Sequence, residues 1–209
     1  IRNCDWSSDV CSSDLYPLVP AISSEIARIG GLAPDADSRQ AGGMEVQTLI
    51  LGAGAAGMFC AAHAGPGALV VDHARAPGEK IRISGGGRCN FTNRDLTFAN
   101  FHSGNRHFHK SALSRYTPQD FITLVERHGI RWHEKTLGQL FCDTSAKEII
   151  AMLRAEMAKA WADLWLETEI GAITHDGAAF RATLRRDGRE HRITARNLVV
   201  ATGGKSIPK

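Results

Sequence analysis

Three glycines spaced as GxGxxG are the residues of this sequence whose chemistry is easiest to read. They follow the apolar run 46–51 and precede a run of small residues. In this motif the first glycine permits a tight turn, the second lets the backbone approach a pyrophosphate, and the third lets a helix pack closely on a strand. The free N–H groups at the start of that helix attract phosphate. The spacing therefore predicts a dinucleotide site, which comprises Gly52, Ala53, Gly54, Ala55, Ala56 and Gly57.

A carboxylate at the end of the next apolar run, 68–71, adds to this prediction. Asp72 can accept hydrogen bonds from both hydroxyls of an adenosine ribose, and it disfavours a 2′-phosphate there. A GxGxxG turn alone is weak evidence, because glycine-rich turns also arise from packing. Here a strand, a helix, a second strand and an acidic residue occur in the order that the motif requires, which favours a bound dinucleotide.

A second glycine-rich segment, KIRISGGGRCNFTN, indicates which dinucleotide. A simple nicotinamide dehydrogenase would continue with regular βαβ units at this point. The three consecutive glycines allow positive φ angles, so that the backbone can lie against a flat or anionic ligand. Donors and acceptors surround them at a density that suits a phosphate, a ribityl chain or a ring system. The alternative is a flexible loop. The segment contains Ser84, Gly85, Gly86, Gly87, Arg88, Cys89, Asn90, Thr92 and Asn93.

Near the other end of the chain, the apolar run 197–201 leads into Thr202, Gly203 and Gly204. A strand placed in this way returns to the cofactor edge of a parallel sheet.

The elements that must position these residues form an α/β pattern. The βαβ start is followed by a helix that Thr117 caps, with Pro118 at its first position, extending to about His128. A second helix begins at the capping box of Ser145 and Glu148. We expect strands at 164–170, 180–184 and 190–194, with turns at Asp176-Gly177 and Asp187-Gly188. The strand 164–170 could place Ile170 near an adenine. The fold class predicted is a Rossmann-like, dinucleotide-binding α/β domain with a parallel sheet and a β-meander.

Composition sets limits on the function. The 209 residues carry a formal charge of +3 and are 43% hydrophobic, which suits one globular domain. The excess of Lys and Arg is scattered, so we expect a solvated basic surface and no nucleic-acid partner; an RNA-binding protein with a basic face is the alternative. The segment 46–71 lacks Asp, Glu, Lys and Arg, but its glycines favour a buried strand and helix, and we expect no membrane partner.

The spacing of the cysteine and histidine residues predicts no metal site. The five cysteines lack CxxC spacing, which favours a reducing, cytoplasmic location. Packing roles are favoured over redox roles for Cys89 and Cys142. His102, His107 and His109 lie close in sequence but match no known ligand pattern.

The first 43 residues differ in character from the rest. Residues 1–15 contain a short tandem echo, SSDVC and SSDL, and resemble translated sequencing-adapter DNA, whereas residues 16–43 are rich in Gly, Ser, Ala and Pro. We expect 1–43 to be a non-native or disordered extension and Met44 to be the natural start.

Four motifs together resemble a known family: GAGAAG, KIRISGGGRCNFTN, LGQLFCDTSAKEI and LVVATGGKSIPK. They are similar to the bacterial NAD(P)/FAD-dependent oxidoreductases that include the YhiN-like and BaiN-like flavoproteins, also called the aminoacetone oxidase family. Members are about twice as long, so the resemblance implies that 44–209 is the N-terminal part of the FAD-binding domain, without the rest of that domain or an inserted second domain.

The resemblance also implies a cofactor and its contacts. Gly52, Gly54 and Gly57 would face the FAD pyrophosphate, and Asp72 would hold the ribose, although the family's usual residue there is Glu. The pyrophosphate and flavin side would be lined by Lys80, Arg82 and 84–90, and a second FAD turn would comprise Ala201, Thr202, Gly203 and Gly204.

NAD(P)H is the electron donor that the resemblance implies, and a small molecule is the expected substrate. No catalytic residue or oligomeric state follows from the sequence. Two alternatives remain open: a non-catalytic truncated fragment, and an NAD-binding Rossmann protein without flavin.

Overall fold

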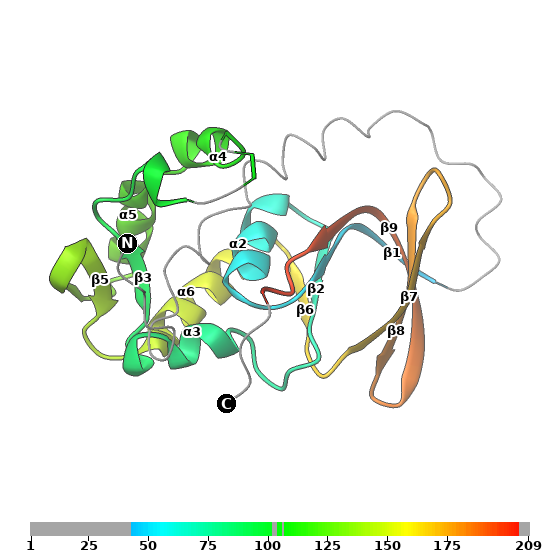
Figure 1. Ribbon diagram of the computed structural model, residues 1–209. Helices are drawn as coiled ribbons and strands as arrows, with labels where there is room; N and C mark the ends of the chain where they lie inside the picture. Colours follow the sequence, from blue (N-terminus) through cyan, green and yellow to red (C-terminus); the bar gives the residue numbers. More distant parts are fainter. Residues whose placement is uncertain (1–42, 102–103, 106, 205–209) are drawn as a thin grey trace.

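The computed structural model describes residues 43–101, 104–105 and 107–204, so the predictions for residues 1–42 and for His102 lie outside the described residues. Its main feature is a six-stranded sheet with the strand order β6-β2-β1-β9-β8-β7 (Figure 1). The first four strands in that order run parallel, and β9, β8 and β7 are antiparallel to one another. The strands are β1 (Met44–Leu51), β2 (Ala68–Val71), β6 (Asp163–Trp165), β7 (Glu169–His175), β8 (Phe180–Arg186) and β9 (Arg189–Val200). The predicted α/β class with a parallel sheet and a β-meander is confirmed.

A second, three-stranded antiparallel sheet has the order β3-β5-β4. Its strands are β3 (Asn90–Asn93), β4 (Trp132–Glu134) and β5 (Gln139–Cys142). The α-helices are α2 (Ala55–Ala64), α3 (Glu79–Ile83), α4 (Lys110–Arg115), α5 (Pro118–Arg127) and α6 (Ala146–Lys159). Short 3₁₀ turns are η3 (Ser84–Gly87), η4 (Phe98–Asn100) and η5 (Thr136–Gly138). Among the described residues, no helix is both long and apolar enough to cross a bilayer.

Two hydrophobic clusters cover the two faces of the main sheet, as the alternation of side chains along a strand requires. Ile50 and Val70 point into the larger cluster, which includes residues of α2, α5 and α6. Leu49 and Leu69 point to the opposite face and pack with Leu184 and other residues of the β-meander. The central strands are therefore buried on both sides, which explains why their sequences are continuously apolar.

The capped helices begin where the sequence predicts. Thr117 accepts a hydrogen bond from Asp120 N at 3.3 Å, and Ser145 accepts one from Lys147 N at 3.2 Å. Each helix also has the reciprocal contact of a capping box. The apolar faces of α5 and α6 are buried, so these two helices are scaffold.

The strand expected at 164–170 is a wrong prediction, because two strands share this segment. β6 ends at Trp165, Glu167 has a positive φ of 50°, and β7 begins at Glu169. The chain leaves one edge of the sheet after β6 and joins the other edge as β7. Thr168 N donates to Asp72 O at 2.9 Å at this crossing.

The strands expected at 190–194 and 197–201 are instead one strand, β9, which ends at Val200. Its first part pairs antiparallel with β8, and it pairs parallel with β1 from Met44↔Ile193 to Leu51↔Val200. Because its pairing with β8 overlaps its pairing with β1, the strand continues without a turn between the two halves.

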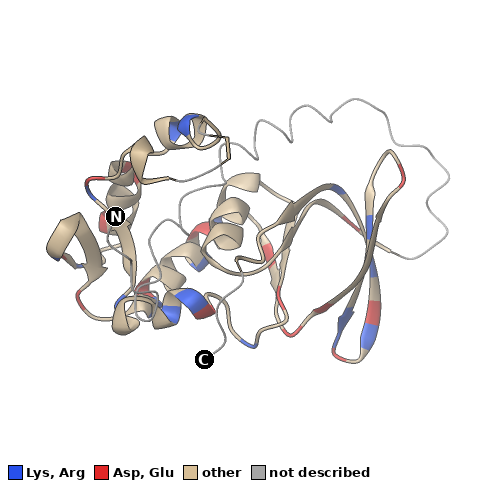
Figure 2. Cartoon of the chain, viewed as in Figure 1, with Lys and Arg blue, Asp and Glu red and all other residues tan. Residues whose placement is uncertain are grey.

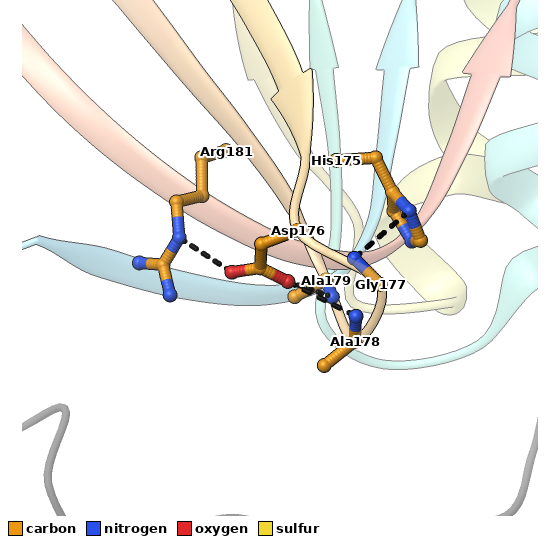
Figure 3. Close-up of polar contacts among 6 residues, drawn as sticks. All are labelled: His175, Asp176, Gly177, Ala178, Ala179 and Arg181. Carbon is orange, nitrogen blue, oxygen red and sulfur yellow. Dashed lines mark hydrogen bonds and ion pairs between the residues drawn. The ribbon is translucent and has the colours of Figure 1, made fainter.

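The turn between β7 and β8 is closed by a side chain of the turn itself (Figure 3). Asp176 Oδ1 accepts hydrogen bonds from the backbone N–H groups of Ala178 and Ala179 at 3.0 and 2.9 Å, and Oδ2 accepts from Arg181 Nε at 2.8 Å. These bonds, the backbone ones first, hold the pKa of the Asp176 carboxyl well below its usual range.

Candidate functional site

The two predicted glycine turns and Asp72 meet at the carboxyl edge of the parallel strands. Gly52 N donates to Val71 O at 2.8 Å, and Ala201 N donates to Leu51 O at 2.8 Å. The ends of β1, β2 and β9 are therefore adjacent. Ligands of doubly wound α/β folds bind at this edge of the sheet.

The three glycines of the first turn differ in what a side chain at each position would meet. A Cβ on Gly57 would overlap the carbonyl oxygen of Gly52, so Gly57 permits the close approach of α2 to β1. Gly52 has φ of 107°, and a Cβ there would overlap Ala201 O. By contrast, a Cβ on Gly54 would meet no atom within 4 Å. Gly52 and Gly57 serve the fold, whereas the space beside Gly54 is open to a ligand.

The N-terminus of α2 lacks the side-chain acceptors that begin α5 and α6. Gly54 is its N-cap and forms no side-chain cap, and the first turn contains no acidic residue. The first N–H groups of a helix have no partner within the helix and carry its positive dipole end. This end of α2 can therefore receive an anion.

Asp72 is held against the first turn. Its Oδ2 accepts from Ala53 N at 2.6 Å, and its Oδ1 accepts from Ala74 N at 2.9 Å. Its side chain keeps 17% of its accessible surface, and His73 Nδ1 lies 3.3 Å from Oδ1. Each carboxylate oxygen can accept more than one hydrogen bond, so these contacts leave capacity for ribose hydroxyls.

Lys80 and Arg82 have different partners, although both are on α3. Lys80 Nζ donates to Gly204 O at 2.9 Å, which joins α3 to the second glycine turn. Arg82 donates to Pro77 O at 3.0 Å and lines a separate hollow with residues of α6. The structure thus brings Lys80, and not the Arg82 head group, to the Thr202–Gly204 turn.

The loop 84–90 combines buried and open backbone. Gly85, Gly86 and Gly87 have φ angles of 55°, 64° and 84°. A Cβ on Gly85 would lie 2.5 Å from Phe141, whereas one on Gly86 would meet nothing within 4 Å. Ser84 is buried and donates to Ile81 O, and Arg88 is exposed. Gly86 and Gly87 therefore present backbone that a flat ligand could approach.

Asn90 contributes a buried polar atom to the same loop. The residue is 6% exposed, and its Oδ1 has no hydrogen-bond partner among the described residues. Because an unpaired buried acceptor is unfavourable, it indicates a missing donor. The open backbone, the uncapped helix and this acceptor together fit a dinucleotide with a polar ring system.

The cysteines near the loop are buried thiols. Burial raises the pKa of Cys89 to about 11, against a smaller lowering by a hydrogen bond with Ser84. Burial, followed by the proximity of Cys89, raises the pKa of Cys142 to about 12. Both are therefore protonated near neutral pH, which supports the packing role expected for them. His109 is also buried, with Nε2 3.1 Å from Phe98 O.

Ile170 lies on β7, opposite Leu184, and is 37% exposed. The residue two positions before it, Thr168, is fully buried and donates its backbone N–H to Asp72 O. Sequence reasoning missed Thr168 because a lone threonine gives no periodic signal. It also missed Gly78, whose N–H donates to Ala53 O at 2.8 Å and supports the first turn.

Comparisons with known proteins agree with this geometry. The family described as "HI0933-like protein Rossmann domain" matches residues 46–209. The chain is 50% identical over 163 residues to a protein of Escherichia coli (strain K12) named "Ribosomal RNA dihydrouridine synthase", covering 77% of this chain and 40% of that protein. A Haemophilus influenzae protein of the same name is 46% identical over 167 residues, covering 78% and 41%. The chain thus spans about two fifths of the length of these curated relatives.

Two solved structures show the same fold at low identity. One is 3-ketosteroid-delta4-(5alpha)-dehydrogenase from Rhodococcus jostii RHA1, with a TM-score of 0.54 and 13% identity over 79% of this chain and 47% of that one. The other is E. coli quinol fumarate reductase FrdA, with a TM-score of 0.51 and 19% identity over 77% of this chain and 33% of that one.

Proposed function

The chain belongs to the HI0933-like family of Rossmann-domain proteins, the family that its motifs indicated, and on this premise we propose that it is the FAD-binding part of a flavoprotein oxidoreductase. Because the chain spans about two fifths of its curated relatives, this activity is proposed for the whole protein. The buried cysteines Cys60, Cys89 and Cys142 are free, which supports a cytoplasmic location.

The observation that carries the proposal is the uncapped N-terminus of α2, which lies between Asp72 and the second glycine turn. Here the helix would hold the pyrophosphate, with open space beside Gly54 for its oxygens. Asp72 would accept the ribose hydroxyls. The arrangement supplies a positive helix end for the phosphates and a carboxylate for the neutral sugar, as a dinucleotide requires.

The loop 84–90 favours FAD over NAD alone. Its open glycines and the unpaired Asn90 Oδ1 would suit the polar edge of an isoalloxazine ring. When bound, FAD would supply the redox chemistry by accepting a hydride and passing on two electrons. The residues of this chain would bind and orient it, and Lys80 would anchor the Thr202–Gly204 turn to α3. We propose NAD(P)H as the electron donor.

A visible absorbance spectrum tests the proposal. The full-length protein should be purified and supplied with FAD, and NADH or NADPH should then be added. Flavin absorption that bleaches with either donor supports a flavin reductase. A folded full-length protein that binds NAD and stays colourless with FAD contradicts the proposal and supports the NAD-binding alternative.

The names of the curated relatives favour a particular substrate, and we propose that the whole protein reduces uridine in ribosomal RNA. Dihydrouridine differs from uridine by two hydrogens across the C5–C6 bond, so its formation requires two electrons and two protons. A flavin reduced by NAD(P)H could supply them. This proposal departs from the expectation of a small-molecule substrate and no nucleic-acid partner.

The substrate proposal has a direct assay. Ribosomal RNA from cells that lack the gene should gain dihydrouridine when it is incubated with the full-length protein, FAD and NADPH. Dihydrouridine can be detected by mass spectrometry of the nucleosides. Unchanged RNA after incubation with a protein whose flavin does bleach would contradict this substrate and leave the flavoprotein proposal standing.

A further inference from the structure

A basic hollow lies between α3 and α6, outside the two glycine turns. The residues that line it are Arg82, Lys147, Ile150, Ala151 and Arg154, and none of them is acidic. Figure 2 shows basic positions on both helices. Concave surfaces lined by charges of one sign concentrate ions of the opposite sign, so the hollow is suited to an anion.

The cations of the hollow are not neutralised by the protein. Arg82 donates only to the carbonyl oxygen of Pro77, and the side chains of Lys147 and Arg154 form no ion pair or hydrogen bond in the described part of the chain. The two acidic residues of α6 are engaged elsewhere. Glu148 contacts Thr144 and Ser145 at the cap, and Glu156 pairs with His128 and Lys159.

The spacing of the cations suits an extended anion better than a single phosphate. Lys147 and Arg154 are both exposed and lie two helical turns apart, about 10 Å along α6. The pyrophosphate of a dinucleotide already has a site at α2 in the proposed function. A second row of cations with no carboxylate among them is typical of contacts with a nucleic-acid backbone.

Through Arg82, the hollow includes part of α3, the helix that leads directly into the loop assigned to the flavin. Arg82 is two residues before Ser84, and its backbone carbonyl oxygen lies 3.9 Å from the point that a Cβ added to Gly87 would occupy. RNA held along α6 would therefore contact the helix that leads into this loop.

We infer that Arg82, Lys147 and Arg154 bind backbone phosphates of the RNA substrate beside the flavin loop. The inference rests on the proposed reduction of ribosomal RNA and adds a location to it. Phosphate contacts position a nucleic acid without reading its sequence, so binding at this site should be insensitive to sequence and sensitive to salt.

The test compares two double variants of the full-length flavoprotein that lose the same charge. Lys147→Gln/Arg154→Gln removes two cations of the hollow. Arg189→Gln/Arg196→Gln removes two exposed cations of β9, neither of which has a salt-bridge partner in the described part of the chain. Binding of a labelled single-stranded oligouridylate is measured between 50 and 200 mM KCl, with flavin absorbance and Tm as checks of folding.

Loss of two phosphate contacts should lower the slope of log K against log salt by about 1.4, since each contact with a single strand contributes about 0.7. The β9 double variant should keep the slope of the unaltered protein. Equal effects of the two variants, or an unchanged slope in the Lys147/Arg154 variant, would overturn the inference. If the Lys147/Arg154 variant showed only a higher KM for NADPH, the hollow would be assigned to binding of NADPH, and the inference would also be overturned.

The result also separates this inference from the proposed function. An unaltered protein that binds no oligouridylate and forms no dihydrouridine would overturn both the substrate and the RNA site. An unaltered protein that forms dihydrouridine, together with a Lys147/Arg154 variant whose salt slope is normal, would overturn the RNA site alone.

Discussion

The three helices of ten or more residues in the described part of the chain, α2, α5 and α6, begin in two different ways. α5 and α6 are capped by their own side chains, with Thr117 and Ser145 as acceptors and an acidic residue in each first turn. α2 begins at Gly54 with neither. The first N–H groups of α2 therefore remain available to an acceptor from outside the helix, whereas those of α5 and α6 are already engaged. Among these three helices, the two with complete caps are scaffold, and α2, which lacks a cap, belongs to the candidate site; the six-residue helix α4 also lacks a side-chain cap and lies outside that site.

The two kinds of glycine at the start of α2 sharpen this comparison. Gly57 is surrounded by backbone, whereas Gly54 has open space beside it. Within one motif, glycine therefore permits close packing at one position and ligand access at another. Substitutions should separate the two roles.

Gly57→Ala should have the largest effect, because its methyl group would overlap the carbonyl oxygen of Gly52 and neither backbone can move freely. We expect a loss of more than about 3 kcal/mol in the free energy of unfolding, or no soluble protein. Urea denaturation measures this loss. Gly54→Ala is the matched control and should keep a free energy of unfolding close to that of the unaltered protein. A Gly57→Ala variant of normal stability would show that α2 lies farther from β1.

Gly54→Asp should give α2 the kind of side-chain cap that α5 and α6 already have. A carboxylate at the N-cap should stabilise the protein without cofactor by about 0.5 to 1 kcal/mol. It should also repel the pyrophosphate by about 3 kcal/mol, for unit charges about 6 Å apart at an effective dielectric constant of about 20. This repulsion corresponds to a roughly 100-fold loss of FAD affinity.

Thermal denaturation without FAD and a titration with FAD measure the two effects of Gly54→Asp. Gly54→Asn is the control, because it caps the helix and fills the same space without a charge. FAD affinity that falls equally in both variants would mean that steric exclusion, and not the helix end, governs the site.

Ser145→Ala removes a cap from a scaffold helix and should act on stability alone. Loss of the acceptor for Lys147 N should cost about 1 kcal/mol. This corresponds to a fall in Tm of about 2–4 °C for a domain of this size. FAD affinity should not change. A weaker affinity for FAD in this variant would contradict the division between capped scaffold and open site.

Short spacings in the sequence were sufficient to predict the local structure around the candidate site. The GxGxxG turn and Asp72 lie within one βαβ unit, and the caps of α5 and α6 depend on residues three positions apart. Each of these features is determined by neighbours along the chain. For this reason the α/β class and the position of the open helix follow from local patterns.

Features that depend on distant partners could not be predicted in the same way. β9 is one strand because β1 and β8 hold its two sides, and neither neighbour is visible in the alternation of residues 189–200. β6 and β7 are divided because they join opposite edges of the sheet. Alternation of apolar residues indicates that a segment is a strand, but it does not show which strand lies beside it.

The placement of Lys80 and Arg82 shows the same limit within the site. Residues two apart on a helix do not share a face, so α3 could not direct both side chains to one ligand. The sequence contains that information, but the partner of each residue depends on the fold. Lys80 reaches Gly204, whereas Arg82 lies with Lys147 and Arg154 of α6.

The smallest expected effect concerns the turn between β7 and β8, in which the carboxylate of Asp176 accepts hydrogen bonds from the turn's own backbone. Asp176 accepts hydrogen bonds from two backbone N–H groups, as an N-cap does, so these N–H groups are already engaged, unlike those at the start of α2 (Figure 3). Because the pKa of Asp176 is lowered in the folded state, the carboxylate stabilises the fold above its usual pKa. That stabilisation is lost as the pH falls below about 4.

Asp176→Asn should therefore lower the Tm slightly at pH 7 and less at each step below about pH 4, where the unfolded state of the unaltered protein takes up a proton and the advantage of the charged carboxylate shrinks. Thermal denaturation of both proteins from pH 7 to pH 3 measures the difference. Asp187→Asn, in the neighbouring turn between β8 and β9, is a control because only an exposed ion pair with Arg186 at 3.6 Å involves its side chain. A difference in Tm that stays constant over this range would mean that the amide replaces the carboxylate as an acceptor, and that charge adds nothing to the closure of this turn.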